Sequence, residues 1–405
     1  MKSVELFAGA GGLGLGLCLA GFEPQAVIEW DKWACDTIRE NKSCGYPLVK
    51  DWSIFEGDAR LFDYSSIDSE VDLISGGPPC QPFSLGGKHK AFKDRRDMFP
   101  IAVDAVRKLS PRAFIFENVK GITRSSFANY FQYIILQLSY PEIVRNEDED
   151  WLHHLSRLEC QKTSGKVNGL TYNVVARLLN AADYGVPQHR ERVFIVGFRN
   201  DQNQEWSFPK KTHSLDGLLD QQWISKKYWD RHGISSKNRP DITVRYATRI
   251  KKLSQASLFE TSHKPWRTVR DAIHDLPNPL LNKADNAFYH DHNFQPGAKA
   301  YPGHTGSPLD FPAKTLKAGD HGVPGGENML VGLDGSVRYF TIRESARLQT
   351  FPDGYKFHGS WTETMRQLGN AVPVVLARVV GKSVADQLLR TKESEIKQKI
   401  SRVAS

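Results

Sequence analysis

The chain has 405 residues, of which 40% are hydrophobic and 25% charged, a composition typical of a soluble globular protein with ample core. Its net charge of +8 mildly favours a polyanionic partner. Its five cysteines form no Cys-x-x-Cys pair, so they suggest neither a disulfide framework nor a metal site, and we expect a reducing cytoplasm. The apolar run Leu13–Ala20 is too short and glycine-rich for a signal peptide, and no stretch is expected to span a membrane.

The first predicted element is a strand over Val4–Phe7 that leads into a glycine-rich loop. Gly9, Gly11 and Gly14 satisfy the pattern Gly-x-Gly-x-x-Gly, which lets a ligand approach the backbone closely at a helix N-terminus. We expect this helix to run through Leu19. Taken alone, the pattern fits a dinucleotide as well as S-adenosylmethionine.

The second predicted strand, Gln25–Glu29, ends in an acid. A carboxylate at this position can accept hydrogen bonds from the ribose hydroxyls of either cofactor. Trp30 follows directly and could stack on adenine or pack in the core, and the residues themselves do not separate these roles. A helix is expected over Asp31–Asn41. A third strand around Trp52–Phe55 should end in the turn Gly57-Asp58-Ala59.

A short apolar strand over Val71–Ile74 precedes a stiff loop that carries one thiol. This loop is Gly76-Gly77-Pro78-Pro79-Cys80-Gln81-Pro82-Phe83-Ser84, and its prolines fix φ and prevent helix formation. A rigid polar loop suits a nucleophile, because the thiolate need not be ordered before it attacks. The charged segment 85–96, which includes Arg96, is expected to close over phosphates.

A strand over Arg112–Phe116 should follow a helix over Met98–Leu109. Glu117 would then lie at the same sheet edge as Cys80, if the two strands are neighbours. A carboxyl group beside a thiol can protonate or hold a ring nitrogen while the thiolate attacks. The charged residues 146–166 are expected to form a surface insertion of unassigned role.

Two further strands, Tyr172–Leu178 and Val193–Gly197, enclose the sequence Gln188-His189-Arg190-Glu191-Arg192. In an extended chain Arg190 and Arg192 point the same way, which would direct two guanidinium groups at a phosphate or a base carbonyl. A pair of surface ion-paired arginines is the alternative.

The alternation of helices and strands stops between about Asn200 and Tyr339. Turn-forming residues there predict a separate small domain of short strands and loops. Within it, Lys226–Lys252 carries nine basic and two acidic side chains with interleaved aromatic residues, a pattern that suits a nucleic-acid surface. A solvated charged face is the alternative. The glycine-bearing loop 315–322 could also reach a groove.

The last predicted elements are two helices. Thr341 is a cap signal for a short helix that carries Ala346, Leu348 and Phe351. A longer helix is expected over about Val374–Leu389.

Several of these segments resemble the motifs of the cytosine-5 DNA methyltransferase family. Pro78–Ser84 is similar to the family's nucleophile motif, and the resemblance covers nearly the whole chain in family order. It is weakest in residues 146–166 and in the variable region. The other similar segments are Phe7–Gly12, Glu29-Trp30, Asp58, Glu117–Val119, Gln188–Arg192, Thr341–Pro352 and Gln367–Pro373.

The resemblance implies an α/β fold, a Rossmann-like mixed sheet of S-adenosylmethionine-dependent methyltransferases, with a smaller target-recognition domain. Residues 1–199 and 362–395 would form the catalytic domain, and 200–361 the recognition domain and hinge. The cofactor would be S-adenosylmethionine and the substrate double-stranded DNA. The enzyme would be a cytoplasmic monomer of a restriction-modification system, with any cognate endonuclease acting separately and no membrane partner.

The resemblance also implies three sets of site residues. The catalytic residues would be Cys80, Glu117, Arg190 and Arg192. The cofactor would be held by Phe7, Gly9, Ala10, Gly12, Glu29, Trp30, Asp58, Ala59, Pro79, Asn370 and Val372. DNA would be contacted by Gln81, Ser84, Arg96, Gln188, Lys226, Lys227, Arg245, Arg249 and Lys317.

Two other functions are compatible with parts of the chain. An oxidoreductase would use the Gly9–Gly14 loop for a dinucleotide, but it leaves Cys80 and Asn370 unexplained. A non-catalytic DNA-binding relative should have lost Cys80 or Glu117, and both are present. An RNA cytosine-5 methyltransferase is harder to separate from a DNA enzyme, although a large variable region favours duplex DNA.

Overall fold

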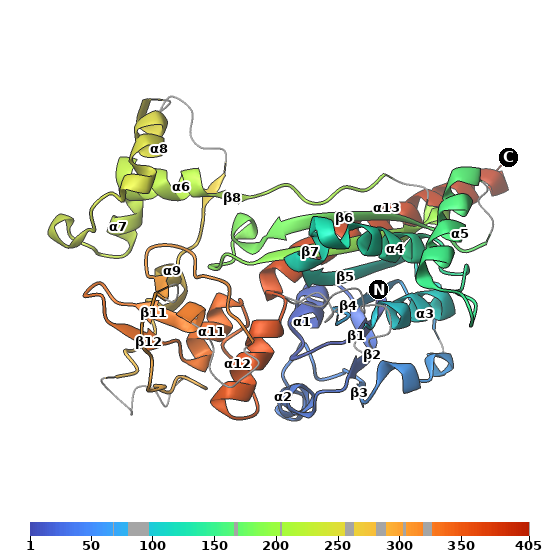
Figure 1. The fold of residues 1–405 in the computed structure, drawn as a ribbon, viewed down its shortest axis with the longest axis horizontal. Coiled ribbons are helices and arrows are strands. Elements are labelled where there is room, and N and C mark those ends of the chain that lie inside the picture. The colour runs from blue at the N-terminus through green and yellow to red at the C-terminus, as the bar shows by residue number, and fades with distance from the viewer. Residues whose placement is uncertain are drawn as a thin grey trace. The chain divides into compact units, whose positions relative to one another are not determined.

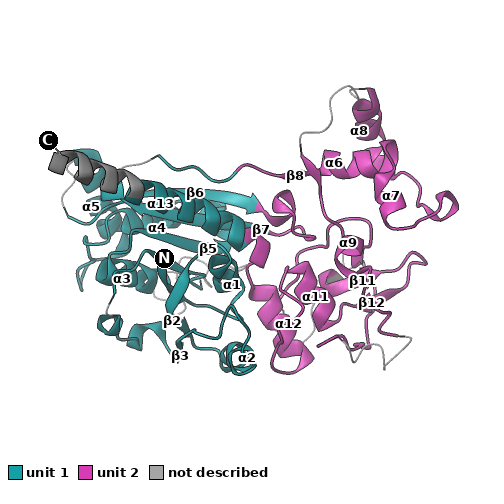
Figure 2. Ribbon diagram, turned by 180° about the vertical axis from the view of Figure 1, so that it is seen from behind, with its two compact units in different colours: residues 1–179, 191–209, 377–405 teal, residues 180–190, 210–376 magenta. Residues whose placement is uncertain are grey.

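The structure, a computed structural model, describes residues 1–67, 69–79, 97–165, 169–202, 205–255, 263–280, 289–302, 305–318 and 326–404. Four predicted site residues lie outside these ranges: Cys80, Gln81, Ser84 and Arg96. The chain forms two compact units (Figure 2). Unit 1 comprises Met1–Leu179, Glu191–Pro209 and Ala377–Ser405, and unit 2 comprises Asn180–Arg190 and Lys210–Leu376. These bounds place residues 180–190 and 362–376 in unit 2, and the roles of the predicted domains remain a prediction.

Unit 1 is built on a seven-stranded sheet of order β3-β2-β1-β4-β5-β7-β6 (Figure 1). The neighbours from β3 to β5 run parallel, and β7 is antiparallel to β5. The predicted α/β fold with a mixed sheet is therefore confirmed. The strands are β1 (Lys2–Leu6), β2 (Glu23–Glu29), β3 (Ile54–Glu56), β4 (Leu73–Gly76), β5 (Ala113–Val119), β6 (Tyr172–Asn180) and β7 (Glu191–Arg199).

Two helices of unit 1, α2 and α5, begin at aspartate caps. The Asp31 carboxylate accepts from the Ala34 N–H at 3.0 Å and starts α2, and Asp150 accepts from the Leu152 and His153 N–H groups to start α5. The helices are α1 (Gly12–Cys18), α2 (Lys32–Ser43), α3 (Phe99–Leu109), α4 (Ala128–Ser139), α5 (Trp151–Ser164) and α13 (Val374–Ala404).

The expectation of a mere surface insertion over 146–166 is wrong in part. Most of this segment is helix α5, and its Leu155 and Leu158 are buried in the main core of unit 1. The His154 imidazole is also buried and bonds the Tyr133 hydroxyl at 2.8 Å. The acidic run Glu147–Asp150 before the helix and the polar residues between its leucines hid this apolar stripe.

The strands divide their side chains between the two faces of the sheet. Val4 and Leu6 of β1 pack in the core with α3, α4 and α5. Side chains alternate along a strand, so Glu5 points to the opposite face, where its carboxylate accepts from the Gly14 N–H of α1. On this face α1 also packs against α13, since a Cβ on Gly381 would lie 2.7 Å from Leu17.

Unit 2 contains short strands, as predicted, but residues 215–255 are largely helical rather than loops. Capping boxes start α9 at Thr268 and Asp271 and α11 at Thr341 and Glu344, and the second confirms the predicted cap. The strands are β8 (His213–Ser214), β9 (Lys264–Pro265), β10 (Ser307–Pro308), β11 (Met329–Val331) and β12 (Val337–Tyr339). The helices are α6 (Leu215–Leu219), α7 (Lys227–Arg231), α8 (Val244–Gln255), α9 (Val269–Ile273), α11 (Ile342–Leu348) and α12 (Trp361–Asn370).

One helical stretch of the described chain, Trp361–Lys392, is long and apolar enough to cross a membrane by length and composition. No such stretch was expected from the sequence. Its most apolar part is 67% buried inside the protein, which is usual for a core helix, so it is weak evidence for a membrane span. It joins α12 to α13 across Ala371–Pro373, which are not helical.

Candidate active site

The sheet has a topological switch point between β1 and β4. From β1 the chain continues to β2 and β3 on one side and then returns to β4 on the other. Leu6 pairs with Gly76, so β1 and β4 end at the same level. The glycine loop and the segment Gly77–Pro79 therefore both begin at the carboxyl edge of the sheet, where open α/β sheets bind ligands.

The glycine loop takes an unusual backbone path. Phe7, which was predicted to end the first strand, instead leaves it with φ 54°, and Gly9 and Gly11 follow with φ 56° and 84°. A non-glycine residue in this left-handed region is strained, and such strain is common at functional sites. An added Cβ on Gly9 would meet no atom within 4 Å, so the space beside it is open. The loop thus presents bare backbone, as a cradle for a ligand requires.

Glu29 holds the glycine loop from the neighbouring strand. Its Oε2 accepts from the Gly9 N–H at 2.7 Å, and its Oε1 accepts from the N–H groups of Trp30 and Asp31. Burial raises the pKa of Glu29, and these three backbone donors oppose that rise. The predicted role of accepting ribose hydroxyls is therefore joined by a structural role that the sequence did not reveal.

The other predicted cofactor residues of unit 1 lie around this loop. Trp30 is 75% exposed, so the alternative of core packing is wrong. The Gly57 N–H bonds the Glu29 carbonyl at 2.9 Å, which brings the Gly57-Asp58-Ala59 turn beside Glu29. The Asp58 carboxylate pairs with Arg60, which lowers the pKa of Asp58. Ala10, Gly12 and Ala59 are buried, and Pro79 is exposed.

Glu5 is a component of this site that the sequence analysis missed. Its Oε1 accepts from the Gly14 N–H at 3.0 Å, and the side chain is buried beneath α1. A Cβ on Gly14 would lie 2.0 Å from the Glu5 Oε2, so the third glycine of the pattern makes room for this carboxyl rather than for a ligand. The signal was an acid in the middle of an otherwise apolar strand.

Replacing Glu5 with Gln should reduce the sensitivity of the protein to rising pH. Burial raises the pKa of Glu5 from 4.5 to about 8, so between these values the folded state keeps a proton that the unfolded chain has released. The stability contribution of Glu5 therefore falls as the pH rises through this window, by at most about 1.4 kcal/mol per pH unit. The shift in urea midpoint between the two ends of the window should be smaller in Glu5→Gln than in the wild type.

The matched control is Glu23→Gln on β2, because this carboxyl is exposed. It should keep the pH response of the wild type. Equal midpoint shifts in the wild type and Glu5→Gln would show that Glu5 is not protonated in the folded protein.

Glu117 and Asn118 lie beside the end of strand β4, which leads toward Cys80. Gly76 pairs with Phe116, and a Cβ on Gly77 would lie 3.4 Å from the Glu117 Oε2. The next residue, Asn118, donates from Nδ2 to the Pro78 carbonyl at 2.9 Å. Strand β5 extends to Val119, so Glu117 lies within it rather than after it. The predicted proximity of the two strands is thus confirmed up to Pro78, and Cys80 lies outside the described residues.

Glu117 is paired with Arg192. The Arg192 Nε lies 2.8 Å from the Glu117 Oε1, across the antiparallel pair β5 and β7. Both side chains are nearly buried, with exposed fractions of 12% and 9%. Burial lowers the pKa of the Arg192 guanidinium, and Glu117 opposes that change. This pair can orient a carboxyl group and a planar donor toward one small heteroaromatic ring.

Arg190 does not join Arg192, contrary to the predicted alternation. Arg190 precedes β7 and belongs to unit 2, where its fully buried guanidinium donates to the Leu316 carbonyl at 3.0 Å and the Gly369 carbonyl at 2.6 Å. The predicted catalytic role of Arg190 is therefore not supported by its contacts. They favour a structural role, which fastens the end of α12 to the segment around Leu316.

Gln188 takes part in the same buried arrangement. Its Nε2 donates to the Leu348 carbonyl and to the Gln349 Oε1, each at 3.2 Å, and its Oε1 accepts from the Leu316 N–H. The side chain is fully buried, so a direct contact with DNA, as predicted, conflicts with this conformation. Asn370 and Val372 follow Gly369 at the end of α12, the first exposed and the second buried.

The predicted DNA contacts of unit 2 fall into two groups. Lys226, Lys227 and Arg245 are exposed. Arg249 and Lys317 are exposed as well, but each is ion-paired, with Asp216 at 2.5 Å and Glu327 at 2.9 Å. Ion pairing weakens the attraction of a cation to phosphate, so the first group is the more available.

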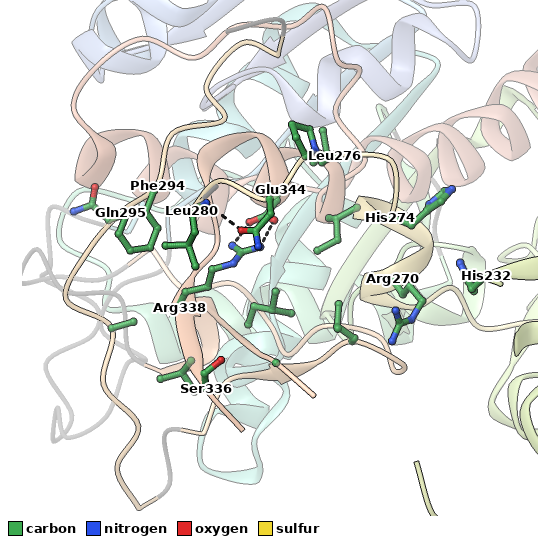
Figure 3. A pocket seen from close by; sticks show the side chains of 18 of the residues that line it. His232, Arg270, His274, Leu276, Leu280, Phe294, Gln295, Ser336, Arg338 and Glu344 are labelled. Carbon is green, nitrogen blue, oxygen red and sulfur yellow. Dashed lines mark hydrogen bonds and ion pairs between the residues drawn. The ribbon is translucent and has the colours of Figure 1, made fainter. Parts of the chain in front are cut away.

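Unit 2 also contains a cavity of about 710 Å³ (Figure 3). Figure 3 shows Arg338 joined to Glu344 at its wall, with Leu276, Leu280 and Phe294 nearby. The basic side chains Arg231, Arg270 and Arg338 on its lining are each paired with a carboxylate. None of the predicted site residues that the structure describes lines this cavity, and we assign it no ligand.

Comparisons with known proteins agree with this geometry. The protein is 31% identical over 393 residues to the Type II methyltransferase M.PspPI of Psychrobacter sp. (strain TA137), covering 95% of this chain and 79% of that one. It is 29% identical to M.NgoMIV of Neisseria gonorrhoeae, covering 95% and 97%. The solved structure of Spodoptera frugiperda DNMT2 shares the fold, with a TM-score of 0.56 at 17% identity over 95% of this chain and 99% of that one. Residues 1–140 and 150–386 match the family described as C-5 cytosine-specific DNA methylase, and the chain belongs to this family.

Proposed function

We propose that the protein transfers a methyl group from S-adenosylmethionine to C5 of a cytosine that has left the stack of duplex DNA. The observation that carries this proposal is the Glu117–Arg192 pair, held beside Gly77 and Pro78 at the switch point of the sheet. These residues bring a carboxylate and a guanidinium close to the segment from which Cys80 follows directly. An enzyme that acts on C5 must take the base out of the helix, because the ring is otherwise stacked and out of reach.

The residues of unit 1 fit the cofactor. The open backbone at Gly9 would hold the amino acid part of the molecule, and the exposed indole of Trp30 and the turn at Asp58 would hold its adenine. Glu29 fixes the loop through the Gly9 N–H and keeps lone pairs available for a ribose hydroxyl. When bound, S-adenosylmethionine supplies an electrophilic methyl group on a sulfonium centre. Asn370 and Val372 would complete the cofactor site.

The chemistry proposed for the chain's own residues starts at Cys80. Its thiolate gives an electron pair to C6 of cytosine, and the electrons of the C5–C6 double bond become available at C5, which takes the methyl group. Glu117, as the protonated carboxyl group, donates a hydrogen bond to N3 as negative charge would build there, and Arg192 orients Glu117 and faces the base carbonyl. C5 then loses its proton to solvent, and the electron pair of the C5–H bond re-forms the C5–C6 double bond. The C6–sulfur bond breaks at the same time, and the thiolate leaves with the electron pair of that bond, which restores the aromatic ring.

Sequence choice is proposed to belong to the segment from about Asn200 to Tyr339 and not to the catalytic motifs. The reaction at Cys80 involves only the cytosine, so neighbouring bases must be read by side chains in a groove. The curated relatives carry the name Type II methyltransferase, and we propose that this protein is likewise the modification enzyme of a restriction-modification system. We expect it to act as a cytoplasmic monomer.

The proposal is tested with S-adenosylmethionine that carries a labelled methyl group. Wild-type protein should transfer the label to duplex DNA and leave it on C5 of cytosine at defined sites, which bisulfite sequencing of the product would locate. Structured RNA is the control polymer, and it should take up no label. Transfer to RNA alone, or binding of DNA without any transfer, would overturn the proposal in favour of an RNA enzyme or a non-catalytic relative.

A further inference from the structure

Helix α8 (Val244–Gln255) packs against other described residues of unit 2 along one side. Tyr246, Ile250 and Leu253 lie at helical spacing on this side, and Ile250 is 8% exposed. The Tyr246 ring stacks on Phe311 with centroids 5.3 Å apart and planes 18° apart. Phe311 in turn packs against the small core formed by Leu218, Tyr228 and Trp229. The helix is therefore held in place while its other side stays uncovered.

The uncovered side is polar, and the helix is strongly basic. Thr248, Lys252 and Gln255 are exposed at positions i, i+4 and i+7, so they form one stripe roughly opposite the packed side. The helix carries four basic residues and no acidic one. Arg249 lies beside the stripe, and its guanidinium donates two hydrogen bonds to the Asp216 carboxylate, of 2.5 and 3.0 Å. No carboxylate of a described residue pairs with Arg245, Lys251 or Lys252 in this way.

We propose that α8 enters the major groove of duplex DNA and that Thr248, Lys252 and Gln255 read base edges there. This inference rests on the proposed function and adds to it the element that chooses the site. An α-helix fits the major groove, and 12 residues span about 18 Å at 1.5 Å per residue. The hydroxyl, ammonium and carboxamide groups of the stripe are side-chain groups that hydrogen-bond base edges.

The basic side chains on either side of the stripe, Lys251 and Arg245, would contact phosphates rather than bases. Lys251 lies beside one edge of the stripe, and Arg245 lies beside the other edge. The Arg245 guanidinium is 5.4 Å from the centre of the Tyr246 ring, and this contact holds the guanidinium in place. Cations on both sides of a groove-bound helix face the two phosphate backbones, and such contacts add affinity without sequence information. The positive charge of α8 favours DNA as its occupant over an acidic protein surface, because the stripe between the cations is hydrogen-bonding rather than apolar.

Single substitutions separate base reading from phosphate contact. Wild type, Thr248→Ala, Lys252→Ala and Gln255→Ala would methylate a pool of duplexes randomised around the cytosine, with bisulfite sequencing as the readout. Loss of a base contact should change the preference at one position by roughly 5- to 150-fold. Lys251→Ala should instead weaken binding to every duplex equally and lower the salt slope measured by fluorescence anisotropy by about 1. The control is Lys299→Ala, because Lys299 is exposed and lies in unit 2 but outside the basic stretch Lys226–Lys252. It should change neither the base preference nor the salt slope.

The outcomes distinguish this inference from the proposed function. All substituted side chains are exposed, so urea midpoints should stay at the wild-type value and a changed preference cannot be attributed to unfolding. If wild type methylates duplex DNA and all three stripe variants keep its preference, α8 does not read bases, although the proposed function stands. If wild type methylates RNA and not DNA, both fail, because the major groove of A-form RNA is too narrow for a helix.

Discussion

Cys80→Ala should transfer no measurable methyl group to DNA, a loss of more than about 10⁴-fold, while the protein still binds S-adenosylmethionine. The physical reason is that C5 of cytosine is a poor nucleophile until a thiolate adds to C6. Alanine cannot form that bond, whereas the glycine loop and Glu29, which hold the cofactor in our proposal, are unaffected. Transfer of a labelled methyl group and calorimetric binding of the cofactor measure the two effects separately.

Covalent trapping gives the same test a positive readout. On duplex DNA that carries 5-fluorocytosine, the fluorine cannot leave as a proton does, so wild type should remain bound to DNA in a denaturing gel. Cys80→Ala should give no such band, and Cys160→Ala, which removes an exposed cysteine on α5, should behave like wild type. Turnover by Cys80→Ala, or failure of the wild type to be trapped, would rule out the covalent mechanism.

Arg190→Ala should destabilise the protein by about 3–5 kcal/mol. The guanidinium is fully buried, and its removal leaves the carbonyls of Leu316 and Gly369 without these donors and a cavity where the side chain was. Lysine keeps the charge but lacks the planar guanidinium group that donates to two carbonyls. Arg190→Lys should therefore lower the free energy of unfolding by about half as much as Arg190→Ala. Urea unfolding monitored by circular dichroism and tryptophan fluorescence measures the change.

Arg245→Ala is the matched control for stability, because this arginine of unit 2 is exposed. It should leave the free energy of unfolding within about 0.5 kcal/mol of wild type. A catalytic Arg190 would show the opposite pattern, namely normal stability with lost activity. That result would restore the role predicted from the sequence and remove the structural one.

Local patterns in the sequence were enough to predict most elements of unit 1. The apolar runs around Val4, Ile74 and Phe114 are strands of the sheet, and Asp31 and Thr341 start helices as expected. Such signals act within a few residues, through side-chain burial and capping hydrogen bonds, so they can be read without knowledge of the rest of the chain. Helix α5 was not predicted, because its apolar positions are separated by polar ones and follow the acidic run Glu147–Asp150.

By itself, then, the sequence determined the α/β fold and the order of the motifs, because strand ends and turns follow from local patterns. The pairing of β4 with β5, which brings Glu117 beside the segment that leads to Cys80, was decided by the tertiary structure. Only the tertiary structure decided what individual polar side chains do. Glu117 pairs with Arg192, and Arg249 pairs with Asp216. The Arg190 guanidinium donates to carbonyls that are 126 and 179 residues away in the sequence, and Glu5 is buried beside Gly14. The reason is physical: a charged group takes whichever partner folding brings within about 3 Å, and no local pattern encodes that distance.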